Sequence, residues 1–390
     1  MIPTLSKTLK AFLFCGAFLV PFCTIASDKY AGFPAPQANF SSHIIEVKNY
    51  LLATQMSQRK PEDVRFNLPF ELPASTSAPY RGRFLLFHGL NDSPYVFTDV
   101  AAELSVRGFD VRAILLPGHG NSPEAQLSMS YTKWISAARE QLQYWDDQDS
   151  SPLYLGGFSL GGVLATALAI EHGNVEGLLL FSPAYKSSMN HLLRWSSLYA
   201  KFKPWMFGGM IIEDNPTKYN SIPINGAAQY YETTQYLKRR WKRKPLEMPV
   251  LVVASRDDSV LDIDFLINVF DRKFKSIKKR LLVYDNAPGL TDSAFMQFRS
   301  SAYPTLRVLN QSHQSVLMSS QNPLFGENGS VLVCNGNDWP TFSACLYSKE
   351  DHWFGAQHTP SPDGIPVARS TYNPDFDTVF SVFDEVFSDK

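Results

Sequence analysis

The sequence has few cysteines and almost no net charge. Only 4 of its 390 residues are cysteine, and 36 lysines and arginines are balanced by 37 aspartates and glutamates. A chain this evenly charged has no overall field that would attract nucleic acid or acidic partners. It also has no internal repeat and no low-complexity tract, and its hydrophobic content of 44% is that of a globular protein.

The sequence lacks the motifs of common metal and nucleotide sites. It contains neither an H-E-x-x-H pair of histidines nor a glycine-rich phosphate-binding loop. We therefore expect that the protein needs no metal, no nucleotide and no other cofactor.

The apolar run near the N-terminus is too short to span a bilayer comfortably. It covers residues 11–23 and follows two lysines, which is typical of a secretory signal peptide. Small residues after it predict that residues 1–26 are removed and that the protein is secreted or periplasmic, with an uncleaved membrane anchor as the alternative. Cleavage would leave only Cys334 and Cys345, which we expect to form a disulfide in an oxidising compartment.

The mature chain begins with a weakly patterned leader and continues as alternating strands and helices. The leader, residues 27–80, contains one amphipathic stretch at 43–55 that predicts a helix. The expected strands are residues 83–87, 109–116, 152–155, 175–182, 249–255 and 280–284, and the expected helices between them are residues 96–108, 131–145, 161–173 and 261–274. This alternation predicts an α/β fold with a mostly parallel sheet covered by helices on both faces.

The alternation is lost between residues 184 and 247, which divides the predicted core into residues 81–183 and 248–390. We interpret this aromatic-rich segment as a helical lid over the carboxyl edge of the sheet, where open α/β sheets bind ligands. Its aromatic side chains either line a substrate pocket or form a packing layer. A basic run at 238–244 surrounds Trp241. It indicates either a solvated charged face or contact with anionic lipid headgroups, with the tryptophan at the membrane interface.

Ser159 lies in a glycine-rich sequence that can position its hydroxyl for nucleophilic attack. Residues 157–161 read Gly-Phe-Ser-Leu-Gly, a G-x-S-x-G motif between an expected strand and an expected helix. The glycines permit a tight, strained turn that raises the hydroxyl above the sheet. The N–H groups of the following helix can stabilise a developing negative charge beside it. The motif therefore predicts a nucleophile.

Two further motifs follow neighbouring strands. Residues 88–94 read HGLNDSP and residues 116–122 read LPGHGNS. Together with the G-x-S-x-G motif, they resemble the α/β-hydrolase superfamily, and within it the bacterial carboxylesterases and the monoacylglycerol lipase-like hydrolases of the serine aminopeptidase S33 type. The resemblance covers residues 83–184 and resumes at Pro249. It implies an α/β-hydrolase fold with a helical lid insertion.

The resemblance also assigns roles within the motifs. The oxyanion hole is expected to consist of the N–H groups of Leu90 and Leu160. His88 and His119 precede the acid in the chain and are interpreted as structural residues of their turns. The acid loop of this superfamily typically reads D-x-V, which fits Asp258 and the two residues after it. Asp257 is the alternative, and either aspartate can instead cap the following helix.

The base is expected after the acid, because the chain order in this superfamily is serine, acid, histidine. We assign it to His313, which follows an apolar, strand-like run at residues 305–309 and precedes another apolar segment. His352 and His358 compete from a loop-like region beyond the cysteine pair.

This set of residues predicts a serine hydrolase that cleaves carboxylic esters through an acyl-enzyme. The expected substrate is a small-molecule ester or lipid with a substantial apolar acyl chain. A peptide or amide hydrolase of the proline aminopeptidase type is one alternative, and a binding protein that keeps the fold without catalysis is the other. No feature of the sequence indicates an oligomeric state.

Overall fold

The computed structural model describes residues 32–55, 60–206, 208–242, 245–287, 289–335, 339–349 and 351–388. The predicted signal peptide at residues 1–26 therefore lies outside the described part of the chain. Within these ranges, no helix has the length and apolar character needed to cross a membrane.

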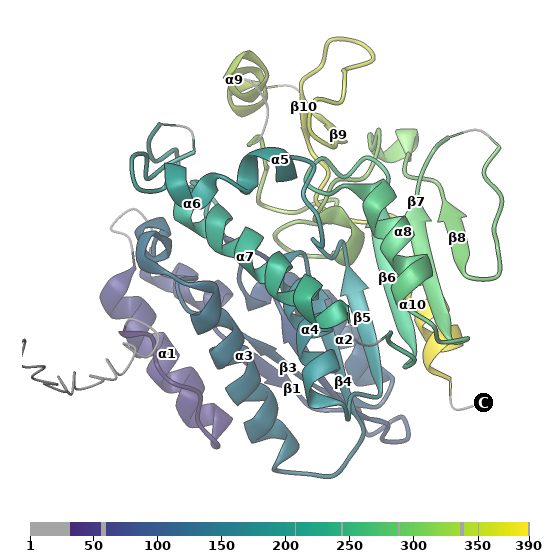
Figure 1. Cartoon of the computed structure of the whole chain (residues 1–390). Coiled ribbons are helices and arrows are strands. Elements are labelled where there is room, and N and C mark those ends of the chain that lie inside the picture. The colour runs from purple at the N-terminus through teal and green to yellow at the C-terminus, as the bar shows by residue number, and fades with distance from the viewer. Residues whose placement is uncertain are drawn as a thin grey trace, which may run out of the picture.

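A twisted eight-stranded sheet forms the centre of the molecule (Figure 1). Its strand order is β1-β3-β2-β4-β5-β6-β7-β8, in which β1 is antiparallel to β3 and every other neighbouring pair is parallel. The strands are β1 (Phe70–Leu72), β2 (Gly82–Phe87), β3 (Phe109–Ile114), β4 (Leu153–Phe158), β5 (Gly177–Phe181), β6 (Val250–Ser255), β7 (Lys279–Tyr284) and β8 (Met296–Arg299). The carboxyl ends of the parallel strands meet at the upper edge of the sheet in Figure 1.

Helices cover both faces of this sheet. The longer ones are α1 (Phe40–Thr54), α2 (Thr98–Val106), α3 (Tyr131–Asp146), α4 (Leu160–His172), α7 (Ile224–Trp241), α8 (Ile263–Lys273) and α10 (Phe376–Phe387). Val250 and Val252 of β6 pack on one face with α3, α4, α7 and α8, whereas Leu251 and Val253 pack on the other with α2 and α10. Burial on both faces explains why the central strands are apolar at consecutive positions.

The predicted α/β-hydrolase fold is confirmed, and β2 to β7 lie where strands are expected. Other elements differ from the prediction. β1 belongs to the predicted leader, yet it pairs with β3 and extends the sheet. β8 is an unpredicted parallel strand of partly buried residues beside β7, too short to show a clear hydrophobic period. The strand-like run at 305–309 is not a strand of the sheet, because a 3-10 turn (Pro304–Leu306) and a left-handed Arg307 (φ 56°) interrupt it.

The insertion at 184–247 has two parts (Figure 1). The short helices α5 (Asn190–Leu193) and α6 (Ser196–Tyr199) lie above the carboxyl edge of the sheet, and α7 runs down beside α4. Trp241, at the end of α7, is 6% exposed, and its ring centroid lies 4.8 Å from that of Tyr185. The interpretation that Trp241 lies at a membrane interface is therefore wrong, because the core encloses its ring.

A second segment rises above the carboxyl edge near the C-terminus (Figure 1). It contains α9 (Trp339–Tyr347) and a parallel pair of short strands, β9 (Trp353–Gly355) and β10 (Val367–Arg369). A disulfide joins Cys334, before α9, to Cys345 within it, with Cα atoms 5.7 Å apart. We call this segment, from residue 331 to residue 371, the C-terminal wall.

Candidate active site

Ser159 lies at a sharp turn between β4 and α4. Its backbone is strained, with φ 53° and ψ −116°, and its N–H donates to the carbonyl of Phe181 (3.1 Å). The glycines of the motif allow the strand, the turn and the helix to approach closely. A Cβ on Gly161 would lie 1.7 Å from the carbonyl oxygen of Phe87, and one on Gly157 would lie 2.2 Å from the carbonyl oxygen of Gly161. The glycines are therefore required at this turn, because side chains at these positions would collide with the backbone.

Backbone N–H groups approach Ser159 from two sides. Leu160 is the first residue of α4, so its N–H has no partner within the helix. On the other side, the loop after β2 is close enough that a Cβ on Gly89 would lie 3.3 Å from Cβ of Ser159. Leu90, the next residue, lines the same pocket as Ser159. The two predicted oxyanion donors are thus on the segments that border the serine.

His313 and Asp258 are joined by a short hydrogen bond. Nδ1 of His313 donates to Oδ2 of Asp258 over 2.6 Å, and the side chain of Asp258 is fully buried. The other carboxylate oxygen, Oδ1, accepts the N–H groups of Val260 (2.8 Å) and Leu261 (3.2 Å). The ring of His313 also packs on Phe158, with centroids 4.8 Å apart. Because Phe158 directly precedes Ser159, this contact holds the imidazole beside the serine turn.

The alternative residues lie elsewhere. Asp257 is directed away from His313, and its Oδ2 accepts from the hydroxyl of Ser301 (3.2 Å). Neither predicted aspartate caps the next helix, because Asp262 accepts the N–H of Phe265 at the start of α8. His352 donates to the carbonyl of Cys345 (2.8 Å). Among the described residues that line the pocket, His313 is the only histidine, so neither His352 nor His358 lines it.

His88 and His119 are buried beneath the turns of their motifs. Nδ1 of His88 contacts the carbonyl of Gly89 (2.8 Å), and its Nε2 accepts the N–H of Leu116 (3.0 Å). Burial holds the pKa of His88 well below its ordinary value, and the nearby His119 lowers it further. Burial also lowers the pKa of His119 to about 4. Both rings are therefore neutral near pH 7, and they join the loops after β2 and β3.

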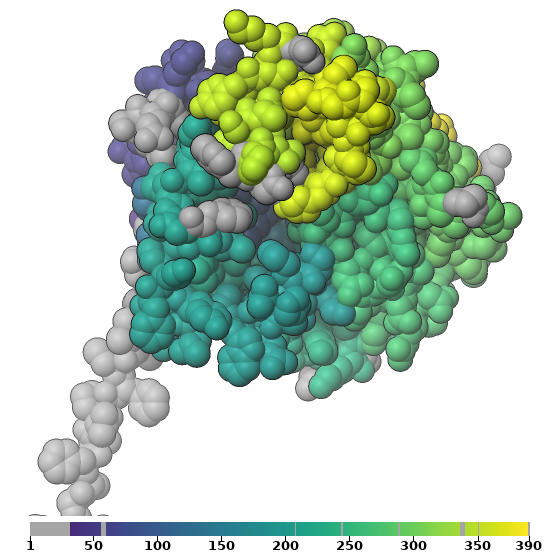
Figure 2. Space-filling model, turned by 90° about the horizontal axis from the view of Figure 1, so that it is seen from above, coloured from purple at the N-terminus to yellow at the C-terminus, as the bar shows by residue number. Residues whose placement is uncertain are grey.

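Ser159 and His313 open into one pocket of about 330 Å³ above the carboxyl edge of the sheet. Figure 2 shows a hollow there, between the teal surface of the insertion and the yellow-green and yellow surface of the C-terminal wall. The lining residues are Leu90, Asn91, Ser159, Ala184, Ile211, Lys218, Tyr219, Asn220, Ile222, Tyr230, Val260, Ser312, His313, Gln314, Val333, Asn335, Arg369, Ser370 and Thr371. The pocket is therefore bounded by two segments that lie far apart in the sequence.

The insertion is attached by hydrogen bonds to the loop after β2. The N–H of Tyr219 donates to the carbonyl of Asn91 (2.8 Å), and the Asn91 side chain donates to the carbonyl of Ser221 (3.2 Å). The hydroxyl of Tyr219 donates to Asn121, in the loop after β3 (2.9 Å). These contacts fix one wall of the pocket relative to the serine.

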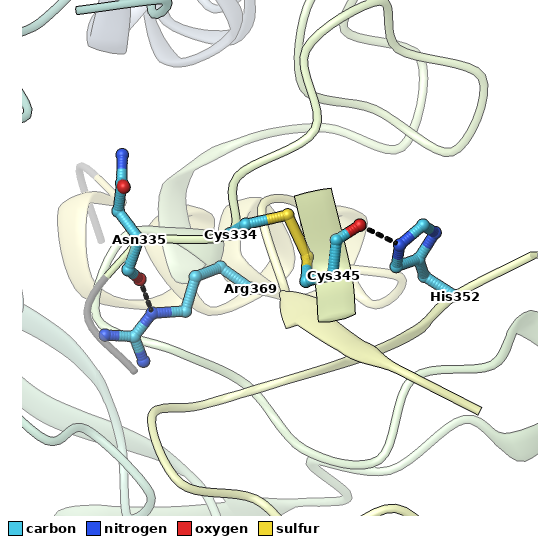
Figure 3. The surroundings of a disulfide bond; sticks show 5 residues. All are labelled: Cys334, Asn335, Cys345, His352 and Arg369. Atoms are coloured by element: carbon cyan, nitrogen blue, oxygen red, sulfur yellow. Dashed lines mark hydrogen bonds between the residues drawn. A yellow bond between two sulfur atoms is a disulfide. The ribbon is translucent and has the colours of Figure 1, made fainter. Parts of the chain in front are cut away.

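Sequence reasoning missed two cations in the pocket, Lys218 and Arg369. Lys218 donates to Oε1 of Gln314, the neighbour of His313. Nε of Arg369 donates to the carbonyl of Asn335 (3.0 Å), and Figure 3 shows its guanidinium directed away from the Cys334–Cys345 disulfide. Both residues are isolated in sequence, so no motif marks them.

The topology of the sheet is that of an α/β-hydrolase, and the strained serine turn and the hydrogen-bonded His313 line one pocket. A family model described as "Serine aminopeptidase, S33" matches residues 78–288, more than half of the chain. The protein therefore belongs to this family. The match ends before His313 and the C-terminal wall.

The chain is similar to lipolytic proteins. Over 100 residues it is 27% identical to the thermostable monoacylglycerol lipase of Bacillus sp. (strain H-257), and this alignment covers 26% of this chain and 40% of that lipase. Among solved structures, it resembles one from work on the metagenome-derived lipolytic enzymes LipS and LipT, with 18% identity over 56% of this chain and 87% of that chain (TM-score 0.48). It also resembles the monoglyceride lipase of Saccharomyces cerevisiae, with 17% identity over 56% and 81% of the two chains (TM-score 0.46).

Proposed function

We propose that the protein hydrolyses carboxylic esters with Ser159 as nucleophile, His313 as base and Asp258 as the acid that orients it. The 2.6 Å hydrogen bond between Asp258 and His313, on a pocket that also contains Ser159, is the observation that carries the proposal. The carboxylate favours the tautomer with the proton on Nδ1, which leaves Nε2 available to accept the serine proton.

The reaction then follows the chemistry of acyl transfer. The Ser159 oxygen attacks the ester carbonyl as His313 removes its proton, and the N–H groups of Leu90 and Leu160 stabilise the tetrahedral oxyanion. The imidazolium returns its proton to the departing alcohol. Water, deprotonated by the same imidazole, releases the acid from the acyl-enzyme.

The proposed substrate has an apolar acyl chain, as in a monoacylglycerol. Similarity to the monoacylglycerol lipase of Bacillus supports this class, and Ile211, Ile222 and Val333 supply apolar surface to the pocket. Each buried methylene contributes about 0.8 kcal/mol, so kcat/KM should rise about fourfold per carbon until the pocket is full.

The test is a series of p-nitrophenyl esters from acetate to palmitate, together with labelling by a fluorophosphonate probe. Wild-type protein should be labelled and should turn over the esters, and Ser159→Ala should abolish both. A folded wild-type protein that is never labelled would instead indicate a binding protein. A steep preference for acetate would rule out the long acyl chain.

Amide hydrolysis is the second candidate, because the matching family is described as a serine aminopeptidase. The same nucleophile can cleave an amide when the leaving amine is protonated by the base. Aminoacyl p-nitroanilides distinguish the two functions. If they are cleaved with a higher kcat/KM than every ester in the series, the ester assignment is wrong.

The exposed side chains of the insertion are evidence for contact with a lipid surface. Several of its large apolar side chains are exposed, and we call the five between residues 192 and 202 the lid patch: Leu192, Trp195, Leu198, Tyr199 and Phe202. Three exposed cations lie among them in sequence, namely Arg194, Lys201 and Lys203. Exposed apolar groups with neighbouring cations are suited to an anionic lipid surface. The disulfide supports an oxidising compartment, which is consistent with the predicted secretory signal.

A further inference from the structure

The ionised groups on the pocket wall carry charge of one sign. Arg369 and Lys218 both line the pocket, and no aspartate or glutamate is among its described lining residues. Asp258 lies behind His313 with its side chain fully buried, and Asp92 is also buried outside the lining. A substrate in this pocket therefore meets two cations and no carboxylate.

The two cations are close enough to repel each other. Burial lowers the pKa of Lys218 most, Asp92 opposes this shift, and Arg369 adds to it. Burial lowers the pKa of Arg369 to about 10, and Asp258 opposes this shift. Arg369 therefore stays charged at neutral pH. Asp92 and Asp258 offset part of this repulsion from outside the pocket lining, and an anion bound in the pocket would offset more of it.

Within the described part of the chain, the hydrogen bond that Arg369 donates comes from Nε and not from the outer part of its guanidinium. Nε is engaged by the carbonyl of Asn335, and no ion pair to Arg369 is present among the described residues. The terminal nitrogens extend beyond this bond, away from the disulfide (Figure 3). A planar guanidinium with two terminal nitrogens is suited to a carboxylate or a phosphate. Asn335 adjoins Cys334, so the disulfide anchors the segment that orients the arginine.

We propose that Arg369 and Lys218 form an anion subsite, and that the preferred ester carries a carboxylate or phosphate group beyond its scissile bond. The proposal rests on the ester hydrolysis proposed above and specifies its substrate class. Asn335 and Ser370, which line the same pocket as the two cations, supply polar atoms around the anion. The apolar side chains of the insertion contact the rest of the substrate.

The test compares p-nitrophenyl esters of one chain length whose acyl chains end in a methyl group, a carboxylate or a phosphate. Wild-type protein should favour one of the charged esters over the methyl ester in kcat/KM, and the better of the two identifies the anion. Arg369→Gln and Lys218→Gln should each lower this preference about tenfold or more, since each loses a charge-assisted hydrogen bond. Arg369→Lys, which keeps the charge, should retain part of it.

Arg239→Gln is the matched control, because Arg239 is an exposed cation of α7 that does not line the pocket. It should keep the wild-type preference. The subsite proposal is wrong if the wild-type protein favours the methyl ester. It is also wrong if the variants at Arg369 and Lys218 keep the preference seen in Arg239→Gln.

A binding measurement separates this proposal from the catalytic one and requires no change at either cation. Isothermal titration calorimetry of Ser159→Ala with octanamide and with suberic acid monoamide compares neutral and anionic ligands of equal length. The anionic ligand should bind about tenfold more tightly or better. Equal affinities would reject the subsite even if esters are hydrolysed. Tighter anion binding without any ester turnover would leave the subsite standing and reject the proposed function.

Discussion

Nδ1 of His313 lies 2.6 Å from Oδ2 of Asp258, although the two residues are 55 positions apart in the sequence. Replacing Asp258 with asparagine should keep the fold, but His313 would then contact a neutral amide instead of a carboxylate. By analogy with serine proteases, kcat for p-nitrophenyl esters should fall about 10⁴-fold. Asp257→Asn is the control and should stay within about threefold of wild type, because Asp257 contacts Ser301 instead. Equal losses in the two variants would contradict the assignment of the acid.

The serine turn should tolerate no side chain at Gly161. A Cβ there would lie 1.7 Å from the carbonyl oxygen of Phe87, so β2 or α4 would have to move. We expect Gly161→Ala to lower the free energy of unfolding by about 3 kcal/mol and to abolish activity. Gly209→Ala, where no atom lies within 4 Å of the added Cβ, should change it by less than about 0.5 kcal/mol. Urea unfolding of both variants checks the prediction.

The Cys334–Cys345 disulfide closes a short loop, with a sequence separation of 11. Cross-linking a loop of this size should stabilise the protein by about 2–3 kcal/mol. Cys345→Ser should therefore lower Tm, and dithiothreitol should lower the Tm of wild type but not of the variant. Mass spectrometry of the oxidised protein provides the check. Two free thiols, together with a Tm that reductant does not change, would show that the bond is absent in solution.

Acid should destabilise the protein partly through its buried histidines. Burial lowers the folded-state pKa of His43 and His119 to about 4, from the ordinary 6.5. The unfolded chain then binds more protons between pH 6.5 and 4, so stability that is present above pH 6.5 is lost as pH falls through this window. Each histidine should cost about 2 kcal/mol at pH 5.

Asp92 should act in the opposite direction, because burial raises its folded-state pKa from 3.8 to about 6. The folded protein gains this proton first, which adds stability as pH falls from 6 toward 4. Urea unfolding at several pH values separates the contributions. His119→Phe should reduce the slope by up to one proton, whereas substitution of the exposed His191 by phenylalanine should leave it unchanged. An unchanged slope in His119→Phe would contradict the prediction.

The lid patch should promote binding to anionic vesicles. Phe202 is 79% exposed, and inserting a phenylalanine into an apolar phase contributes about 1.5–3 kcal/mol. Phe202→Ser should therefore weaken co-sedimentation with phosphatidylcholine–phosphatidylglycerol vesicles by about tenfold or more. Ile277 is 83% exposed but precedes β7, at the opposite edge of the sheet, so Ile277→Ser is the matched control. If both substitutions have the same effect, the lid patch has no special role.

The sequence predicts the hydrolase core well because local rules determine it. Continuous apolar runs mark strands buried on both faces, and the glycines around Ser159 mark a turn that needs close approach of the backbone. Asp258 and His313 are identified by the resemblance to the superfamily, not by spacing. The pocket wall is less predictable. Lys218 and Arg369 are single cations in irregular segments, and only the tertiary fold brings them together.

The basic run at 238–244 illustrates a second limit. A cluster of cations around an aromatic residue suggests a membrane interface, but α7 turns Trp241 inward against Tyr185 and Phe274. Arg240 pairs with Glu171 of α4. Arg243 and Lys244 lie outside the described residues. A local charge pattern cannot reveal which side of a helix the core will cover.

The position of the pocket between two separate segments has a consequence for how the protein can be altered. The proposed nucleophile, oxyanion donors, acid and base all lie outside the insertion and the C-terminal wall, whereas these two segments form the opposing walls of the pocket. The proposed catalytic residues and the walls that would contact the substrate are therefore encoded in different stretches of the gene. Under the proposed function, a directed-evolution library confined to the two walls should change which esters are preferred while the catalytic residues stay unchanged.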